Sequence, residues 1–186
     1  LAKARGRANY QFFDPGMVRS AYDALVMEGE LSQALERGEF ELYFQPQVGT
    51  RDGSLVGAEA LLRWNHPQRG LLLPDAFIPV AERYDLMRDI DRWVIERAFA
   101  DYRRLARERG VERPAEFSIN LSGQSVTNPL FLKFLLAELA RGDIPGDKLI
   151  FEISEADAVE GHAQTQLFMR QLQRHGCRFT LDDFGI

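Results

Sequence analysis

The stretch Gly57–Trp64 places an acid and a base, Glu59 and Arg63, on one side of an otherwise apolar segment. Its alternation with a period of two predicts a strand, so these two side chains share one face. Charged groups on such a face cost desolvation free energy unless a metal, a phosphate or each other compensates them. The residues alone leave two alternatives open, a structural ion pair between Glu59 and Arg63 or a binding site.

Four oxygen-bearing side chains stand at or near the ends of separate expected strands: Glu59, Asn120, Glu152 and Asp182. In parallel α/β folds the carboxyl ends of the strands build the site. Three carboxylates and an amide oxygen favour Mg²⁺ or Mn²⁺, which take oxygen ligands. Asp183 could hold a second cation if the backbone bends there, and two cations are the usual arrangement for phosphodiester hydrolysis. Each residue also has a structural alternative, such as an ion pair or a helix cap.

The elements that would position these side chains follow a regular order. Helical spacing after Asp14-Pro15 predicts a helix over 15–38 that ends at Gly38. Turn residues at 49–53 join two strands, which must be antiparallel because the connection is short. The expected elements after the first helix are strand 40–48, strand 54–63, a loop at 65–70, helices 74–81 and 86–109, strand 116–122, helix 129–141, strand 148–154, helix 160–175 and strand 177–182. The later alternation is typical of parallel βα units.

Composition narrows the function classes. The chain has 186 residues and a net charge of −5, which argues against a nucleic-acid polymer as partner. The single Cys177 excludes an internal disulfide framework and suits a reducing compartment. No apolar run reaches the length of about 18 residues that suggests a membrane span, and the N-terminus lacks a signal-peptide core. We expect a cytoplasmic domain, although segments outside this chain could tether it to a membrane.

An ordered set of motifs over about residues 30–185 resembles the EAL family of cyclic di-GMP phosphodiesterases. The motifs are Gln45-Pro46, Glu59-Ala60-Leu61, Arg63-Trp64-Asn65-His66-Pro67, Asn120-Leu121-Ser122, Glu152-Ile153-Ser154-Glu155 and Asp182-Asp183-Phe184-Gly185. Residues 2–13 resemble the C-terminal end of a diguanylate cyclase, or GGDEF, domain. The expected domains are therefore a GGDEF-like tail at 1–14, a linker helix at 15–38 and a C-terminally truncated EAL domain at 39–186.

The resemblance implies an α/β fold, a modified TIM (β/α)8 barrel with an antiparallel first strand, present here as an N-terminal portion of about five strands. It implies hydrolysis of cyclic di-GMP to the linear dinucleotide, with Mg²⁺ or Mn²⁺ as cofactor and inhibition by Ca²⁺. The implied metal ligands are Glu59, Asn120, Glu152, Asp182 and, for a second cation, Asp183; the four acids of this set are the implied catalytic residues. Arg63 would bind a substrate phosphate, and Gln45 would lie near a guanine or ribose.

The resemblance also implies a homodimer through the EAL domain and an upstream GGDEF-like partner domain. Two other functions stay open, a catalytically inactive EAL-type receptor for cyclic di-GMP and a dimerisation scaffold. Intact metal ligands favour the enzyme. The family's catalytic lysine lies beyond the position of Ile186, so this chain alone is expected to be inactive.

Overall fold

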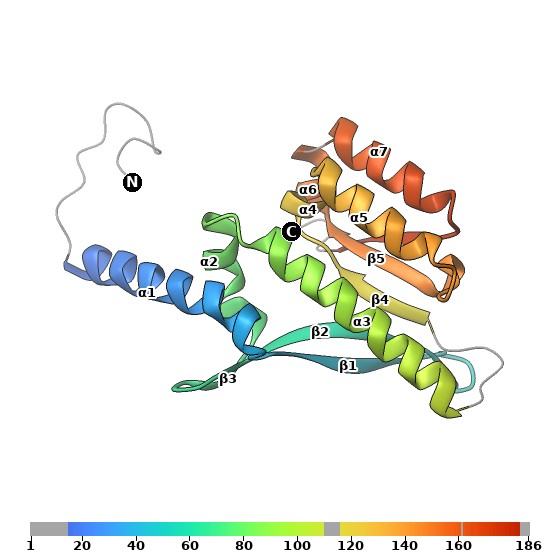
Figure 1. Cartoon of the computed structure of the whole chain (residues 1–186), viewed down its shortest axis with the longest axis horizontal. Helices are drawn as coiled ribbons and strands as arrows, with labels where there is room; N and C mark the ends of the chain where they lie inside the picture. The colour runs from blue at the N-terminus through green and yellow to red at the C-terminus, as the bar shows by residue number, and fades with distance from the viewer. Residues whose placement is uncertain (1–14, 110–115, 161, 183–186) are drawn as a thin grey trace.

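The computed structural model describes residues 15–109, 116–160 and 162–182 (Figure 1). The helices and strands are α1 (Pro15–Arg37), β1 (Phe40–Val48), β2 (Leu55–His66), β3 (Gly70–Leu72), a 3₁₀ turn (Pro74–Ala76), α2 (Ile78–Arg83), α3 (Met87–Arg109), β4 (Glu116–Asn120), α4 (Gly123–Val126), α5 (Pro129–Ala140), a 3₁₀ turn (Gly146–Lys148), β5 (Leu149–Ser154), α6 (Glu155–Glu160), α7 (His162–Gln173) and β6 (Arg178–Asp182). None of the helices in these ranges is long and apolar enough to cross a membrane.

The strands form one mixed sheet in the order β1-β2-β4-β5-β6, with β3 paired to β2. β1 runs antiparallel to β2, whereas β2, β4, β5 and β6 are parallel to one another. This confirms the antiparallel first strand and the α/β class. The sheet is open over the residues that the structure describes.

Helices α3, α5 and α7 lie side by side against one face of the sheet (Figure 1). The strands turn their apolar positions to that face, as the period of two predicts. Tyr102 of α3 meets Phe117 of β4 edge to face at 5.2 Å, and Phe131 of α5 stacks on Phe168 of α7 at 6.3 Å. Trp64 of β2 is fully buried in the same core. The opposite face is therefore the one that carries the polar positions of the strands.

The sheet contains the five expected strands and one more, β3. Six strands occupy the described part of the chain, because β2 continues through His66 and turns back into β3. Asn65–Gly70 was expected to be a loop. Trp64 pairs with Leu72 and His66 with Gly70, so burial of Trp64 and His66 extends the hairpin. A strand of three residues is too short for periodicity to reveal it.

Two other boundaries differ from expectation. Ser122 is not in a strand, since its hydroxyl accepts a hydrogen bond from Ser125 N and begins α4. The expected helix over 160–175 corresponds to α7, and a separate helix that was not expected, α6, precedes it directly after β5. Its start is fixed by Ser154, whose hydroxyl accepts from Asp157 N at 3.1 Å. The S-x-x-D pattern that caps α6 is visible in the sequence.

Candidate functional site

The four predicted metal ligands lie on one face of adjacent strands. Asn120 pairs in register with Glu152, and Ser154 pairs with Asp182 two positions further along the same face. The Asn120 amide Nδ2 donates to Glu59 Oε1 at 2.9 Å. Because that bond uses the amide nitrogen, the side-chain oxygen of Asn120 could act as a ligand for a cation.

The carboxylates in this group repel one another. Burial raises the pKa of Glu152, and the negative charges of Glu59 and Asp182 raise it further, while a hydrogen bond from Ser118 opposes the shift. A raised pKa means that the ionised form of Glu152 is disfavoured where it stands. A cation placed among the three acids would reverse that penalty.

A pocket of about 420 Å³ opens where β2 and β4 separate. The two strands pair only from Gly57 to Ala60 of β2, because β4 ends at Asn120 while β2 continues to His66. The pocket is lined by seven acids, Glu59, Asp75, Glu82, Asp91, Glu152, Asp157 and Asp182, and by no lysine, arginine or histidine of the described chain. Such a lining attracts cations and would reject a bare phosphate.

The donor types fit a hard divalent cation, because carboxylates and an amide oxygen are what Mg²⁺ and Mn²⁺ take. Among residues 15–109, 116–160 and 162–182, however, no three His, Cys, Asp or Glu side chains lie close enough to hold an ion as they stand. Asp183 lies outside the described residues, as does the whole of 1–14.

Gln45 and Arg63 share the polar face but do not line this pocket. Gln45 stands directly opposite Glu59 in the β1–β2 register. Arg63 donates from Nη1 to Leu62 O at 2.8 Å, and its guanidinium lies 5.5 Å from the centre of the Tyr43 ring. No ion pair joins Arg63 to Glu59, both of which the structure describes. The structural alternative that the sequence left open is thus not present.

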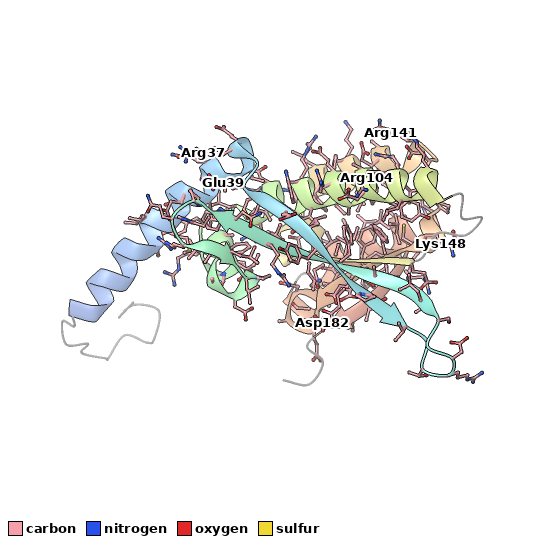
Figure 2. The ribbon with its side chains drawn as sticks, turned by 90° about the horizontal axis from the view of Figure 1, so that it is seen from below. Arg37, Glu39, Arg104, Arg141, Lys148 and Asp182 are labelled. Carbon is pink, nitrogen blue, oxygen red and sulfur yellow. The ribbon has the colours of Figure 1, made fainter. Side chains whose placement is uncertain are left out.

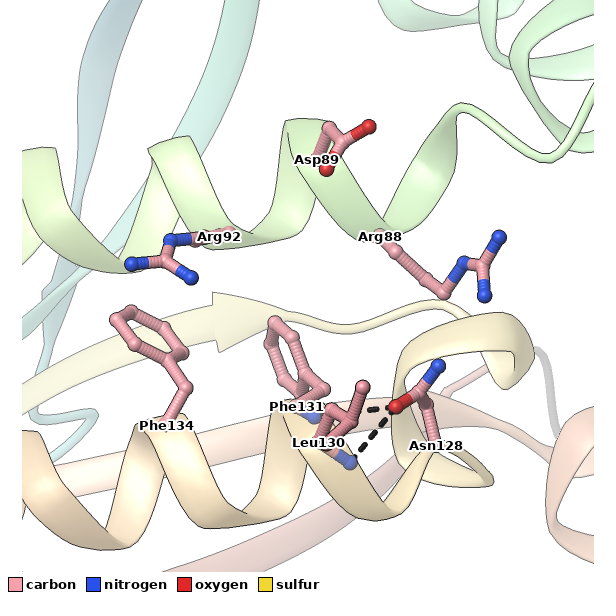
Figure 3. Close-up of a pocket in the computed structure, with 7 residues that line it drawn as sticks. All are labelled: Arg88, Asp89, Arg92, Asn128, Leu130, Phe131 and Phe134. Atoms are coloured by element: carbon pink, nitrogen blue, oxygen red, sulfur yellow. Dashed lines mark hydrogen bonds between the residues drawn. The ribbon is translucent and has the colours of Figure 1, made fainter.

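A second pocket, of about 210 Å³, lies between α3 and α5 and differs in chemistry (Figure 3). Arg88 and Arg92 line it together with the rings of Phe131 and Phe134. The Arg92 guanidinium lies 4.4 Å from the centre of the Phe134 ring. None of the predicted site residues lines this pocket, so a substitution there is a control for substitutions at the strand ends.

Four acids of the larger pocket were not predicted from the sequence, and all four lie outside the strands: Asp75, Glu82, Asp91 and Asp157. A signal for Asp91 was available. It shares helical spacing with the buried residues Val94, Ile95 and Ala98 of α3, so an acid occupies the apolar stripe of that helix. An acid at such a position indicates a specific partner, here Ser122, whose hydroxyl donates to Asp91 Oδ2 at 2.6 Å.

A comparison of the sequence with known families identifies the domain to which these strands belong. Residues 28–186 match the family described as the EAL domain. The chain belongs to the EAL domain family. The match includes all the described strands and begins within α1.

Curated relatives of this EAL chain share about a third of its residues. It is 34% identical over 184 residues to the bifunctional diguanylate cyclase/cyclic di-GMP phosphodiesterase MucR of Pseudomonas aeruginosa, covering 99% of this chain and 27% of that protein. It is 38% identical over 168 residues to the cyclic di-GMP phosphodiesterase PdeF of Escherichia coli, covering 90% of this chain and 22% of that protein. The chain therefore spans about a quarter of the length of these relatives.

Solved EAL structures have the same fold. The PaMucR phosphodiesterase in its c-di-GMP complex superposes with a TM-score of 0.79 at 32% identity, over 86% of this chain and 64% of that one. The FimX EAL domain of Pseudomonas aeruginosa bound to c-di-GMP gives 0.74 at 31% identity, over 88% and 63%. EAL structures are modified TIM barrels, so the described sheet corresponds to part of such a barrel.

Proposed function

We propose that the protein carrying this chain is a divalent-metal-dependent phosphodiesterase that hydrolyses cyclic di-GMP to the linear dinucleotide. The observation that carries the proposal is the alignment of Glu59, Asn120, Glu152 and Asp182 on one face beside an acidic pocket. The names of the relatives supply the substrate, because MucR and PdeF are both described as cyclic di-GMP phosphodiesterases.

Glu59, Asn120, Glu152 and Asp182 would hold a Mg²⁺ or Mn²⁺ ion, and Asp183 would serve a second. A bound divalent cation supplies positive charge to the phosphodiester and makes a water molecule more acidic. The chain's own residues bind and orient: Glu59 and Glu152 would supply the negative charge that holds the cation, and Asn120 keeps Glu59 in place through its amide. Arg63 and Gln45 would hold parts of the substrate on the same face.

The test is an assay of the natural protein that carries these 186 residues, with any sequence that flanks them. Incubation with cyclic di-GMP and Mn²⁺ or Mg²⁺ should release the linear dinucleotide, detected by chromatography. Ca²⁺ in place of Mn²⁺ should permit binding but block turnover. Arg88→Ala, in the pocket between α3 and α5, is the control variant and should keep full turnover. Absence of turnover with every divalent ion would overturn the proposal.

The second candidate is an inactive cyclic di-GMP receptor. It is favoured by the separation of the acids, since no three of those described lie close enough to hold an ion as they stand. The same assay separates the two functions, because a receptor binds cyclic di-GMP in calorimetry and releases no product. For either function we expect a homodimer through the EAL domain and an upstream GGDEF-like domain, and light scattering of the natural protein would test the dimer.

A further inference from the structure

A buried acid outside the predicted ligand set connects α3 to the end of β4. Asp91 is 4% exposed, and its Oδ2 accepts hydrogen bonds from Ser122 N at 3.0 Å and from the Ser122 hydroxyl at 2.6 Å. Ser122 in turn begins α4 by accepting from Ser125 N. One carboxylate on α3 therefore fixes the backbone at the point where the chain leaves the sheet.

The segment that Asp91 holds is the one that presents Asn120. Ser122 lies two residues after Asn120, and Leu121 between them donates its backbone N–H to Glu152 O at 2.9 Å. The segment is thus held by β5 on one side and by α3 on the other. Any movement of Ser122 away from Asp91 would turn the Asn120 amide out of line with Glu59.

A third contact closes this support. The next residue, Gly123, packs against the carboxylate of Asp157, and a Cβ at position 123 would collide with that carboxylate. Asp157 is itself held by the Ser154 hydroxyl at 2.7 Å, at the end of β5. The chain after Asn120 is therefore confined on three sides.

Burying a carboxylate to hold a backbone segment costs desolvation free energy. Burial raises the pKa of Asp91 to about 6, and the charge of Asp157 adds to the effect, while the bonds from Ser122 lower it. A neutral acceptor would hold Ser122 without that penalty. Both Asp91 and Asn120 line the pocket, so the acceptor that holds Ser122 stands beside the amide it would position.

We propose that Asp91 is a positioning residue of the metal site: through Ser122 it aims the Asn120 amide at the cation held with Glu59. This inference rests on the proposed metal-dependent function. Asp91 accepts its hydrogen bonds from Ser122, so it acts through the backbone of the segment that follows β4. Outer partners of this kind typically change metal affinity by about 10–100-fold when they are removed.

The experiment measures Mn²⁺ affinity by calorimetry in the natural protein without substrate, so that it does not depend on turnover. Asp91→Ala should weaken Mn²⁺ binding by about 10-fold or more. Asp91→Asn keeps an acceptor oxygen and should stay within about threefold of wild type. The matched control is Asp101→Ala, because Asp101 is also a buried acid on α3, 6% exposed, but is paired with Arg97 and Arg104 and lies outside the pocket.

Ser122→Ala covers the case in which Asp91→Ala does not fold. It removes one of the two donors to Asp91 and should weaken Mn²⁺ binding in the same direction by a smaller factor. The double variant should bind Mn²⁺ no more weakly than Asp91→Ala alone. Equal Mn²⁺ affinity in wild type and in both single variants would overturn this inference alone. Failure of wild type to bind Mn²⁺ would instead remove the proposed metal site, and the inference with it.

Discussion

The two faces of β2 carry opposite kinds of residue within one strand. Ala60, Leu62 and Trp64 are buried under the helices, whereas Glu59 and Arg63 are half-buried on the opposite face. A slip of one residue in the strand register would exchange the two sets, so the apolar set fixes where the polar set points. Packing of the apolar face therefore positions the polar side chains on the other face.

The polar face has the larger expected effect on function. Glu59→Gln keeps an acceptor for the Asn120 amide but removes a negative charge from the cation site. Because a metal contributes several kcal/mol to transition-state stabilisation, turnover should fall by about 10³-fold or more. The free energy of unfolding without metal should stay level or rise, since repulsion of Glu152 is relieved.

The measurements for Glu59→Gln are steady-state hydrolysis of cyclic di-GMP and urea unfolding of the apo protein. If turnover survives within tenfold of wild type, another group holds the cation. If the variant instead loses stability, Glu59 contributes to folding as well as to the site, and the two faces do not act separately.

The apolar face has the larger expected effect on stability. Trp64 is fully buried against Phe40 and Phe77, with ring centres 5.8 and 5.6 Å away, and its indole N–H donates to Glu39 at 3.0 Å. Trp64→Ala should lower the free energy of unfolding by about 3–5 kcal/mol, as for other large core truncations. Thermal unfolding measures the loss. If the variant folds correctly at low temperature, it should keep its affinity for Mn²⁺. A parallel loss of Mn²⁺ affinity would show that the two faces of β2 do not act separately.

Asp91 does not follow the separation of faces, because it comes from the helical layer and yet lines the pocket. Its folded pKa of about 6 lies above the ordinary 3.8, so the folded protein binds the proton more tightly than the unfolded chain does. Stability should therefore fall as pH rises from about 4 to about 6, by about 3 kcal/mol for a shift of this size. The Asp157 carboxylate facing it acts in the same direction.

The measurement for Asp91 is urea unfolding of the apo wild type and of Asp91→Asn at several values of pH. The free energy of unfolding of the variant should lack this decline, so the two curves should converge toward pH 4. Parallel curves over the whole range would show that Asp91 does not titrate there and that its burial is compensated in another way.

The sequence was most informative where apolar alternation was long. Which residues of β2 share a face, and the existence of the later strands, followed from alternating residues such as Leu62 and Ile119, whose burial requires one face. β3 was missed because three residues carry no period. The spacing of Asp91 within α3 marks it as an acid in an apolar stripe, but its partner, Ser122, is 31 residues away on another element, so only the tertiary fold shows what it holds. Closeness of the predicted ligands is likewise a property of packing, and spacing alone could not reveal it.

On the polar face, substitution of Arg63 has the smallest expected effect. Its guanidinium has the Tyr43 ring and the Leu62 carbonyl as neighbours, and it forms no ion pair within the described residues. It lies on the face of Glu59, four residues further along β2, and could therefore bind a substrate phosphate. A planar guanidinium can donate two hydrogen bonds to one phosphate.

Arg63→Ala should weaken binding of cyclic di-GMP by about 1.5–3 kcal/mol, as expected for a lost hydrogen bond to a charged group. The melting temperature without ligand should change little, because the exchange removes no buried ion pair. Calorimetric titration in Ca²⁺ measures the affinity, with Arg88→Ala as the control arginine on α3. If affinity is unchanged and the apo melting temperature falls sharply, Arg63 belongs with Trp64 as a residue that stabilises the fold. The polar face would then owe its chemistry to the strand-end acids and Asn120, with substrate recognition placed elsewhere.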